Sequence, residues 1–165
     1  MEDYIVSFLD THKEFINSDH VLNLQILSCY FMTGVIWIIQ IVHYPSFKFI
    51  EFKQFLNFQK FHTQMITFVV APMMVLEIFT AFYLLVVNDF STYWTIHIVL
   101  LIAIWLCTAF LSVPIHNLLA KPHITDVERL QLVKLLVKTN WPRTLLWSLR
   151  SLLFIIIIIN FRSIL

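Results

Sequence analysis

Four long apolar runs dominate the sequence and limit what the chain can fold into. A helix needs about 20 apolar residues to cross the hydrocarbon core of a bilayer. Four runs meet this requirement, at roughly residues 22–44, 62–87, 93–117 and 141–161. The strands of a membrane β-barrel would alternate apolar and polar residues, and these runs do not alternate. The sequence therefore predicts an all-α fold, a four-helix transmembrane bundle that forms a single integral membrane domain over residues 1–165.

The composition also indicates a lipid environment. Hydrophobic residues make up 59% of the chain and charged residues only 13%. Soluble domains are about 45–50% apolar and about 25% charged, and one small soluble core could not bury the excess found here. The net charge of +1 provides no basic surface of the kind that binds nucleic acid. The expected partners are the lipid bilayer and a small hydrophobic molecule, with no nucleic acid.

The links between the spans differ in length and character. The turn at residues 88–92 is short, so the second and third spans are expected to form a helical hairpin. The link over residues 121–139 holds a capping-box motif, in which Thr125 is followed three positions later by Glu128. Apolar residues then recur at helical spacing, with Arg129 and two lysines on the polar surface. This pattern predicts a short amphipathic helix that lies in the membrane interface.

Two further segments are expected to lie at the interface. The link over residues 45–61 carries phenylalanines that can enter the acyl boundary while its lysines reach the lipid headgroups. Residues 2–18 form another candidate amphipathic surface helix. The fourth span is expected to begin at Pro142, after a cap at Thr139 or Asn140, because proline is favoured in the first turn of a helix.

Lysine and arginine are unevenly distributed between the two ends of the spans. The termini and the short turn hold only Lys13 and Arg162, whereas the two longer links hold Lys48, Lys53, Lys60, Lys121, Arg129, Lys134, Lys138 and Arg143. Cytoplasmic loops of membrane proteins are enriched in these residues. Both termini are therefore expected to be extracytoplasmic, and the expected location is a bacterial inner membrane.

Polar and aromatic side chains collect at the cytoplasmic end of every span. They are Gln40, His43, His62, His116, Asn117, Asn140, Trp141 and Arg143. One histidine at such a position is satisfied by nearby water and headgroups. Three histidines at one level, with an arginine, are more typical of a functional site, because ionisable groups within a membrane are costly. The sequence thus predicts a polar pocket of His, Arg and Asn residues at this end of the bundle.

Three ionisable residues lie deeper in the spans. Arg150 lies about 10 Å beyond Arg143 along the helix axis and needs a partner or a wet cavity. Trp147 shares the helical face of these two arginines. Glu77 could pair with Arg150 or with His97, and the second pairing is favoured because the depths of Glu77 and Arg150 differ by about 12 Å if the spans start level. Arg150 would then face the polar pocket or a bound anionic or carbonyl-bearing ligand.

Two stretches in the last third of the chain carry a family resemblance. The stretch "VPIHNLLA", at residues 113–120, is followed by "TNWPRTLLWSLRS", at residues 139–151. Together they resemble the anthrone-oxygenase-like family of small four-helix membrane proteins. The positions that match are Pro114, Asn117, Asn140, Trp141, Arg143 and Arg150. The resemblance implies a four-helix membrane fold and the oxidation of a polyketide anthrone by dioxygen without a metal or flavin.

The first functional hypothesis is a protein that binds a small apolar or aromatic molecule and oxidises it as a membrane oxidoreductase. One of His43, His62 and His116 would act as the general base, since a neutral imidazole accepts a proton near physiological pH. Arg143 or Arg150 would stabilise the anion that forms. Tryptophan rings would provide flat apolar walls for the ligand. The predicted ligand-binding residues are Gln40, Asn117, Asn140, Trp141, Trp147 and Arg150.

The identity of any cofactor stays open. Histidines on different helices at one depth can serve as axial ligands of a haem. Cys29 and Cys107 lie inside apolar runs and lack the spacing of metal ligands, so no metal site is predicted.

Two alternative functions come from other classes. A transporter or proton-handling protein could use the intramembrane residues Glu77, His97 and Arg150 as a polar path across the bilayer. Four spans without visible inverted repeats are few for a transporter, so this function would call for a homo-oligomer. In the other alternative the chain is a non-catalytic subunit of a membrane assembly, and its polar residues only satisfy the helix ends.

Overall fold

The computed structural model describes residues 18–162, and its regular structure over that range is entirely helical. Within these residues, four helical stretches are long and apolar enough to cross a membrane. The expected all-α four-helix transmembrane bundle is therefore confirmed. The surface helix expected over residues 2–18 lies outside the described range, apart from its last residue.

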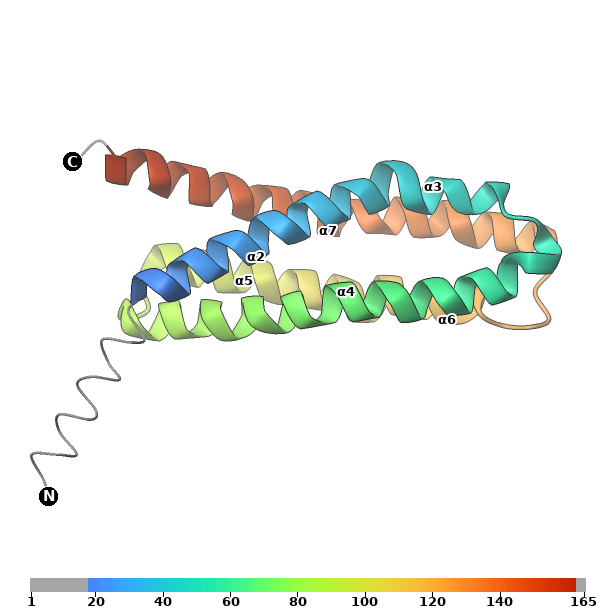
Figure 1. Ribbon diagram of the computed structural model, residues 1–165, viewed down its shortest axis with the longest axis horizontal. Coiled ribbons are helices and arrows are strands. Elements are labelled where there is room, and N and C mark those ends of the chain that lie inside the picture. The colour runs from blue at the N-terminus through green and yellow to red at the C-terminus, as the bar shows by residue number, and fades with distance from the viewer. Residues whose placement is uncertain (1–17, 163–165) are drawn as a thin grey trace, which may run out of the picture.

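The spans alternate in direction along the long axis of the bundle (Figure 1). The elements in chain order are α2 (Ser18–Ile38), the π-helical turn η1 (Ile39–His43), α3 (Tyr44–Ser46), the 3-10 turn η2 (Phe47–Phe49), α4 (Phe52–Val87), α5 (Thr92–Cys107), the π-helical turn η3 (Thr108–Ser112), α6 (Val113–Leu119) and α7 (Asp126–Arg162). Helix α2 packs against α4 and α7, and α5 packs against the same two helices. The four spans thus form a closed square with α2 and α5 on one diagonal.

The two ends of the bundle carry different connections. The link from α3 to α4 and the link from α6 to α7 lie at one end, while the start of α2, the α4–α5 turn and the end of α7 lie at the other (Figure 1). The short turn is confirmed, and Asp89 and Phe90 adopt left-handed conformations there, with φ of 49° and 53°. Both lysine-rich links therefore emerge at the same end.

The second and fourth spans continue well beyond the apolar runs. Helix α4 has 36 residues and α7 has 37, so each is about 54 to 56 Å long, against about 30 Å of hydrocarbon. The capping box is confirmed, since the backbone N–H of Thr125 donates to Glu128 Oε2 at 2.7 Å and that of Glu128 donates to Thr125 Oγ1 at 3.2 Å. The helix that it starts is α7 itself, not a separate interfacial helix. Pro142 lies inside α7, so the expected cap at Thr139 or Asn140 is wrong.

The outer surface of the bundle is apolar and its interior holds charge. Phe68, Phe79 and Phe110 are 79%, 71% and 72% exposed, whereas Glu77 and Arg150 are 0% exposed. A soluble bundle would show the reverse distribution, because water must cover exposed side chains with polar groups. Hydrocarbon is the solvent that suits this surface, and the chain is a multi-pass integral membrane protein.

The phenylalanine-rich link lies only in part where it was expected, since Phe49, Phe52 and Phe61 are 77%, 46% and 63% exposed while other phenylalanines of the link are buried. Phe47 and Phe55 are 0% and 2% exposed. The ring of Phe47 packs edge-on against Phe58 and His62, with centroid distances of 5.1 and 5.0 Å. The link thus contributes an aromatic cluster to the core at this end of the bundle.

Arg129 holds this link in place. It was expected on the surface of α7, but it is only 3% exposed. Its Nη1 atom donates to the carbonyl oxygens of Phe47 and Ile50 at 3.1 and 3.2 Å, and its Nη2 lies 2.6 Å from a carboxylate oxygen of Asp126. Carbonyls at the end of a helix lack helical partners. The guanidinium supplies a donor to Ile50 and a second donor to Phe47, whose carbonyl also accepts from the N–H of Ile50 at 3.3 Å.

Each of the π-helical turns in the described part of the chain stands directly before a proline-containing turn. In η1 the N–H of Tyr44 donates to the carbonyl of Ile39, five residues back, and Pro45 follows. The turn η3 has the same arrangement ahead of Pro114. Because proline lacks an N–H and its ring crowds the carbonyl four residues earlier, a wider turn relieves the clash. Each π turn adds one residue to its helix and so changes which later side chains face inward.

Candidate ligand-binding site

Polar residues from the first, third and fourth spans form a hydrogen-bonded cluster. This cluster, here named the polar chain, consists of Gln40, Tyr44, His116, Asn140 and Arg143. Nδ2 of Asn140 donates to Oε1 of Gln40 at 2.8 Å. Nη2 of Arg143 donates to Oδ1 of Asn140 and, at 3.4 Å, to the hydroxyl of Tyr44. The Tyr44 oxygen lies 3.0 Å from Nε2 of His116. Gln40, His116, Asn140 and Arg143 were all predicted site residues, and the structure brings them together.

The other two predicted histidines form a pair beside the polar chain. Nε2 of His43 lies 2.8 Å from Nδ1 of His62. The ring of His62 lies 5.4 Å from that of His116, centroid to centroid, and its Nε2 has no hydrogen-bond partner among the described residues. His43 is half-buried and His62 is buried. The three predicted histidines thus lie at one level, as expected.

Asn117 and Trp141 do not join this group. Asn117 is exposed on α6, and Trp141 is 41% exposed. The ring of Trp141 packs edge-on against Trp37 at 5.9 Å on the outer surface. Both residues follow an inward-facing neighbour, His116 or Asn140, and successive residues of a helix point about 100° apart. The positions of Asn117 and Trp141 in the sequence predicted their depth in the bundle correctly, but not the direction in which their side chains point.

A cavity of about 260 Å³ extends from the polar chain into the bundle, and all four spans contribute to its lining. Most of the lining is apolar, from side chains such as Ile36, Val70 and Met74. Trp105 and Val113 line the cavity and are also exposed on the outer surface, so the cavity opens toward lipid beside them. The polar side chains of the lining are Tyr44, Thr67, Thr108, Ser112, His116 and Arg143, and hydrogen bonds join Tyr44 to both His116 and Arg143.

The sequence did not single out three residues of this site. Tyr44 and Ser112 line the cavity, and Nε2 of Gln59 lies 2.9 Å from Nδ1 of His116. Gln59 precedes His62 by three positions on α4, and residues at that spacing share a helical face. This spacing could have identified Gln59. Tyr44 and Ser112 carry no such signal, because both lie beside π turns that alter the register.

Glu77 and Arg150 form an ion pair in the interior of the bundle. Nη1 of Arg150 lies 2.6 Å from Oε1 of Glu77, and both side chains are 0% exposed. The indole N–H of Trp147 donates to Oε2 of Glu77 at 3.1 Å. Trp147 also lines the cavity, so the ion pair lies directly behind the cavity wall. The preference for a Glu77–His97 pair is therefore wrong, because it assumed that the apolar runs start level at residues 62 and 141. Helices α4 and α7 begin instead at Phe52 and Asp126, so Glu77 and Arg150 lie 25 and 24 residues from their helix starts.

His97 lies instead in an aromatic part of the core. Its ring is 4.5 Å from Tyr93, 5.6 Å from Trp94 and 4.3 Å from Phe154, centroid to centroid. It is wholly buried, and neither ring nitrogen has a hydrogen-bond partner among the described residues. His97 and the Glu77–Arg150 pair therefore form no continuous hydrogen-bonded path within the described part of the chain.

The geometry of the histidine pair bears on the haem alternative. A separation of 2.8 Å between the ring nitrogens of His43 and His62 is that of a hydrogen bond. Two axial imidazoles would place their nitrogens about 4 Å apart, at about 2 Å for each metal–nitrogen bond. Within residues 18–162, no group of three or more His, Cys, Asp and Glu is placed to hold a metal ion. In this arrangement the pair fits a hydrogen-bonded dyad rather than a set of axial ligands.

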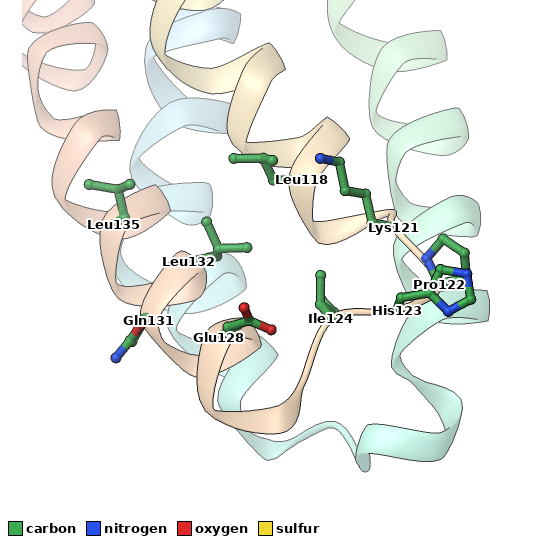
Figure 2. A pocket seen from close by; sticks show the side chains of 9 residues that line it. All are labelled: Leu118, Lys121, Pro122, His123, Ile124, Glu128, Gln131, Leu132 and Leu135. Atoms are coloured by element: carbon green, nitrogen blue, oxygen red, sulfur yellow. The ribbon is translucent and has the colours of Figure 1, made fainter.

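A larger cavity, of about 610 Å³, lies where α6 joins α7. Figure 2 shows that its side chains come from the end of α6, the loop at residues 121–124 and the first turns of α7. Its polar residues, including Lys121 and His123, are exposed, and Glu128 is engaged in the capping box. In the smaller cavity Tyr44 and Arg143 are buried and aligned by hydrogen bonds. The smaller cavity is thus the better candidate for specific binding.

Comparisons of the chain with protein-family models, with curated proteins and with solved structures found no match.

Proposed function

We propose that this integral membrane protein binds a small apolar or aromatic molecule in the cavity beside the polar chain. The division of the cavity lining supports this function. Apolar side chains from all four spans form most of the lining, with Thr67 and Thr108 among them. The other polar groups are those of Ser112 and of Tyr44, His116 and Arg143, and the last three are joined by hydrogen bonds. Such a division orients a ligand, because the walls take its apolar body and the few polar groups fix its head.

The volume of the cavity limits the body of the ligand. An apolar cavity of about 150 Å³ holds one benzene ring, and this cavity measures about 260 Å³. We therefore expect a body of one or two rings, or an alkyl chain of similar volume. Larger substituents of the ligand would extend out of the cavity through the opening beside Trp105 and Val113.

Titration calorimetry of the detergent-purified protein with naphthalene, 2-naphthol and 2-naphthoate tests this function, with empty micelles as the blank. At least one probe should bind saturably at one site per chain. Ala71 lines the cavity, so Ala71→Phe should fill part of it and weaken binding by about tenfold or more.

The matched control is Val99→Phe, because Val99 is 57% exposed on the outer surface of α5 and does not line the cavity. Its affinity for the probes should equal that of the wild type. Absence of saturable binding for all three probes, or equal affinity in Ala71→Phe, would contradict the proposed function.

Oxidation of the bound molecule is a second candidate function. The observation that favours it is that Arg143 lines the cavity, since it is one of the two arginines predicted to stabilise the anion that forms. The family resemblance implies an anthrone, whose third ring would extend through the opening beside Trp105 and Val113. One dioxygen molecule would convert it to an anthraquinone and one water. Oxygen uptake with anthrone above that of empty micelles, lost in Arg143→Gln, supports this function. Uptake at the rate of empty micelles contradicts it.

We also infer that the two longer links face the cytoplasm of a bacterial inner membrane and that both termini are extracytoplasmic. The support is that these links carry most of the Lys and Arg residues and emerge at one end of the bundle (Figure 1). The polar chain would then lie near the cytoplasmic face.

A further inference from the structure

The amide of Gln59 determines which nitrogen of His116 carries the proton. Its Nε2 lies 2.9 Å from Nδ1 of His116 and 3.4 Å from the backbone carbonyl oxygen of the same residue. An NH2 group suits this place better than an amide oxygen, because it can donate to both acceptors, whereas the oxygen would lie beside another carbonyl oxygen. The NH2 group donates, so Nδ1 of His116 accepts and carries no proton. A neutral His116 then holds its proton on Nε2.

This tautomer sets the direction of the hydrogen bonds at Tyr44. Nε2–H of His116 donates to the Tyr44 oxygen, 3.0 Å away, and Nη2 of Arg143 donates to the same oxygen at 3.4 Å. A hydroxyl oxygen accepts two hydrogen bonds, so both positions are taken. The O–H of Tyr44 is then the one hydrogen-bonding group of this side chain that is not engaged. Tyr44 lines the cavity, so this O–H can reach a ligand there. Tyr44 therefore offers a donor to a ligand, not an acceptor.

Two further groups at this end of the cavity point to the same kind of ligand. Nε of Arg143 and Oγ of Ser112 are buried without a hydrogen-bond partner among the described residues. The Nε–H can only donate, and the hydroxyl can donate. Arg143 also carries a positive charge, and no carboxylate within residues 18–162 forms an ion pair with it. A buried cation is stable when an opposite charge accompanies it.

We propose that the head of the ligand is a carboxylate, held by the Tyr44 O–H and the Arg143 guanidinium. The proposal rests on the proposed function, because it names the chemical class of the molecule in that cavity. A carboxylate accepts hydrogen bonds from both groups and neutralises the arginine charge. A phenol leaves that charge unpaired, and an amine adds a second positive charge. Gln59 does not line the cavity and acts as a positioning residue, which holds His116 in the required tautomer.

Nitrogen-15 NMR of histidine-labelled protein tests the tautomer without any ligand. In the wild type, His116 should show an unprotonated Nδ1 and a protonated Nε2. In Gln59→Glu the carboxylate would accept a hydrogen bond from Nδ1–H, so the opposite tautomer should appear. The assignment of His116 rests on the signal lost in His116→Gln. A protonated Nδ1 in the wild type would overturn the proposal whatever binds in the cavity.

The affinities of the naphthyl probes test the ligand class, because the three bodies match and only the heads differ. Wild-type protein should bind 2-naphthoate at least about tenfold more tightly than 2-naphthol or naphthalene. Gln59→Glu should reduce this preference by at least about tenfold, since Tyr44 would then donate to His116. Gln131→Glu is the matched control, because it adds the same charge at an exposed position of α7 and should leave the preference unchanged.

The possible results separate the two proposals. Saturable binding of 2-naphthol or naphthalene with no preference for 2-naphthoate would overturn the carboxylate proposal and leave the proposed function standing. An unchanged preference in Gln59→Glu would overturn the role of Gln59. Failure of all three probes to bind would end both proposals.

Discussion

Nη1 of Arg150 lies 2.6 Å from Oε1 of Glu77 in a part of the bundle where both side chains are 0% exposed. Removal of one partner from such a pair leaves an uncompensated charge in a low-dielectric interior, which costs about 3–5 kcal/mol. Arg150→Met should therefore lower the free energy of unfolding by about this amount. Unfolding of the purified protein in mixed micelles, followed by circular dichroism, measures the loss.

The double variant Glu77→Leu/Arg150→Met is the control for this prediction. Apolar side chains of similar volume often replace a buried ion pair without loss of stability. The double variant should be more stable than either single variant. Stability losses that simply add would show that the two charges do not depend on each other.

Trp147→Phe should also destabilise the protein. The indole N–H of Trp147 donates to Glu77 Oε2 at 3.1 Å, and a hydrogen bond to a charged group contributes about 1.5–3 kcal/mol. Phenylalanine retains most of the ring packing but has no donor. The same unfolding measurement checks this change. Trp141→Phe is the matched control, because Trp141 is 41% exposed and lies outside the ion-pair network; equal losses in the two variants would contradict the prediction.

Arg129→Ala should loosen the link between α3 and α4. The side chain donates to the carbonyls of Phe47 and Ile50, so its removal leaves the Ile50 carbonyl unpaired, at a cost of about 1–3 kcal/mol, and leaves the Phe47 carbonyl with only the N–H of Ile50. Limited proteolysis should then cleave near Ile50 faster than in the wild type. Lys134→Ala, at an exposed position of the same helix, should be cleaved at the wild-type rate. Equal rates for both variants would show that Arg129 does not hold the link.

Cysteine labelling of intact bacterial cells tests the orientation of the bundle. In a Cys107→Ala background, where the remaining Cys29 is buried, an impermeant maleimide should react with Asp89→Cys in the α4–α5 turn. Lys121→Cys, in the α6–α7 link, should react only after the cells are permeabilised. The reverse pattern would show that the longer links face outward.

The bundle itself was predictable, because bilayer thickness sets a minimum length for each apolar run. The level of the site was also predictable, since the polar residues at the span ends, such as Gln40 and His116, converge in the structure. The start of the fourth span could not be predicted from the sequence. Pro142 would begin a helix in most soluble proteins, but a membrane helix can continue through proline because neighbouring groups satisfy the freed carbonyl.

The direction of individual side chains was the other limit. Arg129 reads as a surface residue because its acceptors, the carbonyls of Phe47 and Ile50, are distant in sequence. Trp141 reads as a pocket residue because its neighbour Asn140 is one. The depth of a residue along a helix follows from counting residues. The direction in which its side chain points depends on packing and on local changes of register, which a sequence pattern does not show.

The π turn η1 gives this dependence on register a genetic consequence. Removal of one residue from Ile39–His43 would restore ordinary helical winding and leave the following side chains facing as they do now, because five residues of a π turn cover about the same angle as four residues of an α-helix. Tyr44 would then keep its place at the chamber. The loss of a single codon within this turn is therefore absorbed by the winding, whereas the same loss elsewhere in the first span would rotate Tyr44 by about 100° and turn it away.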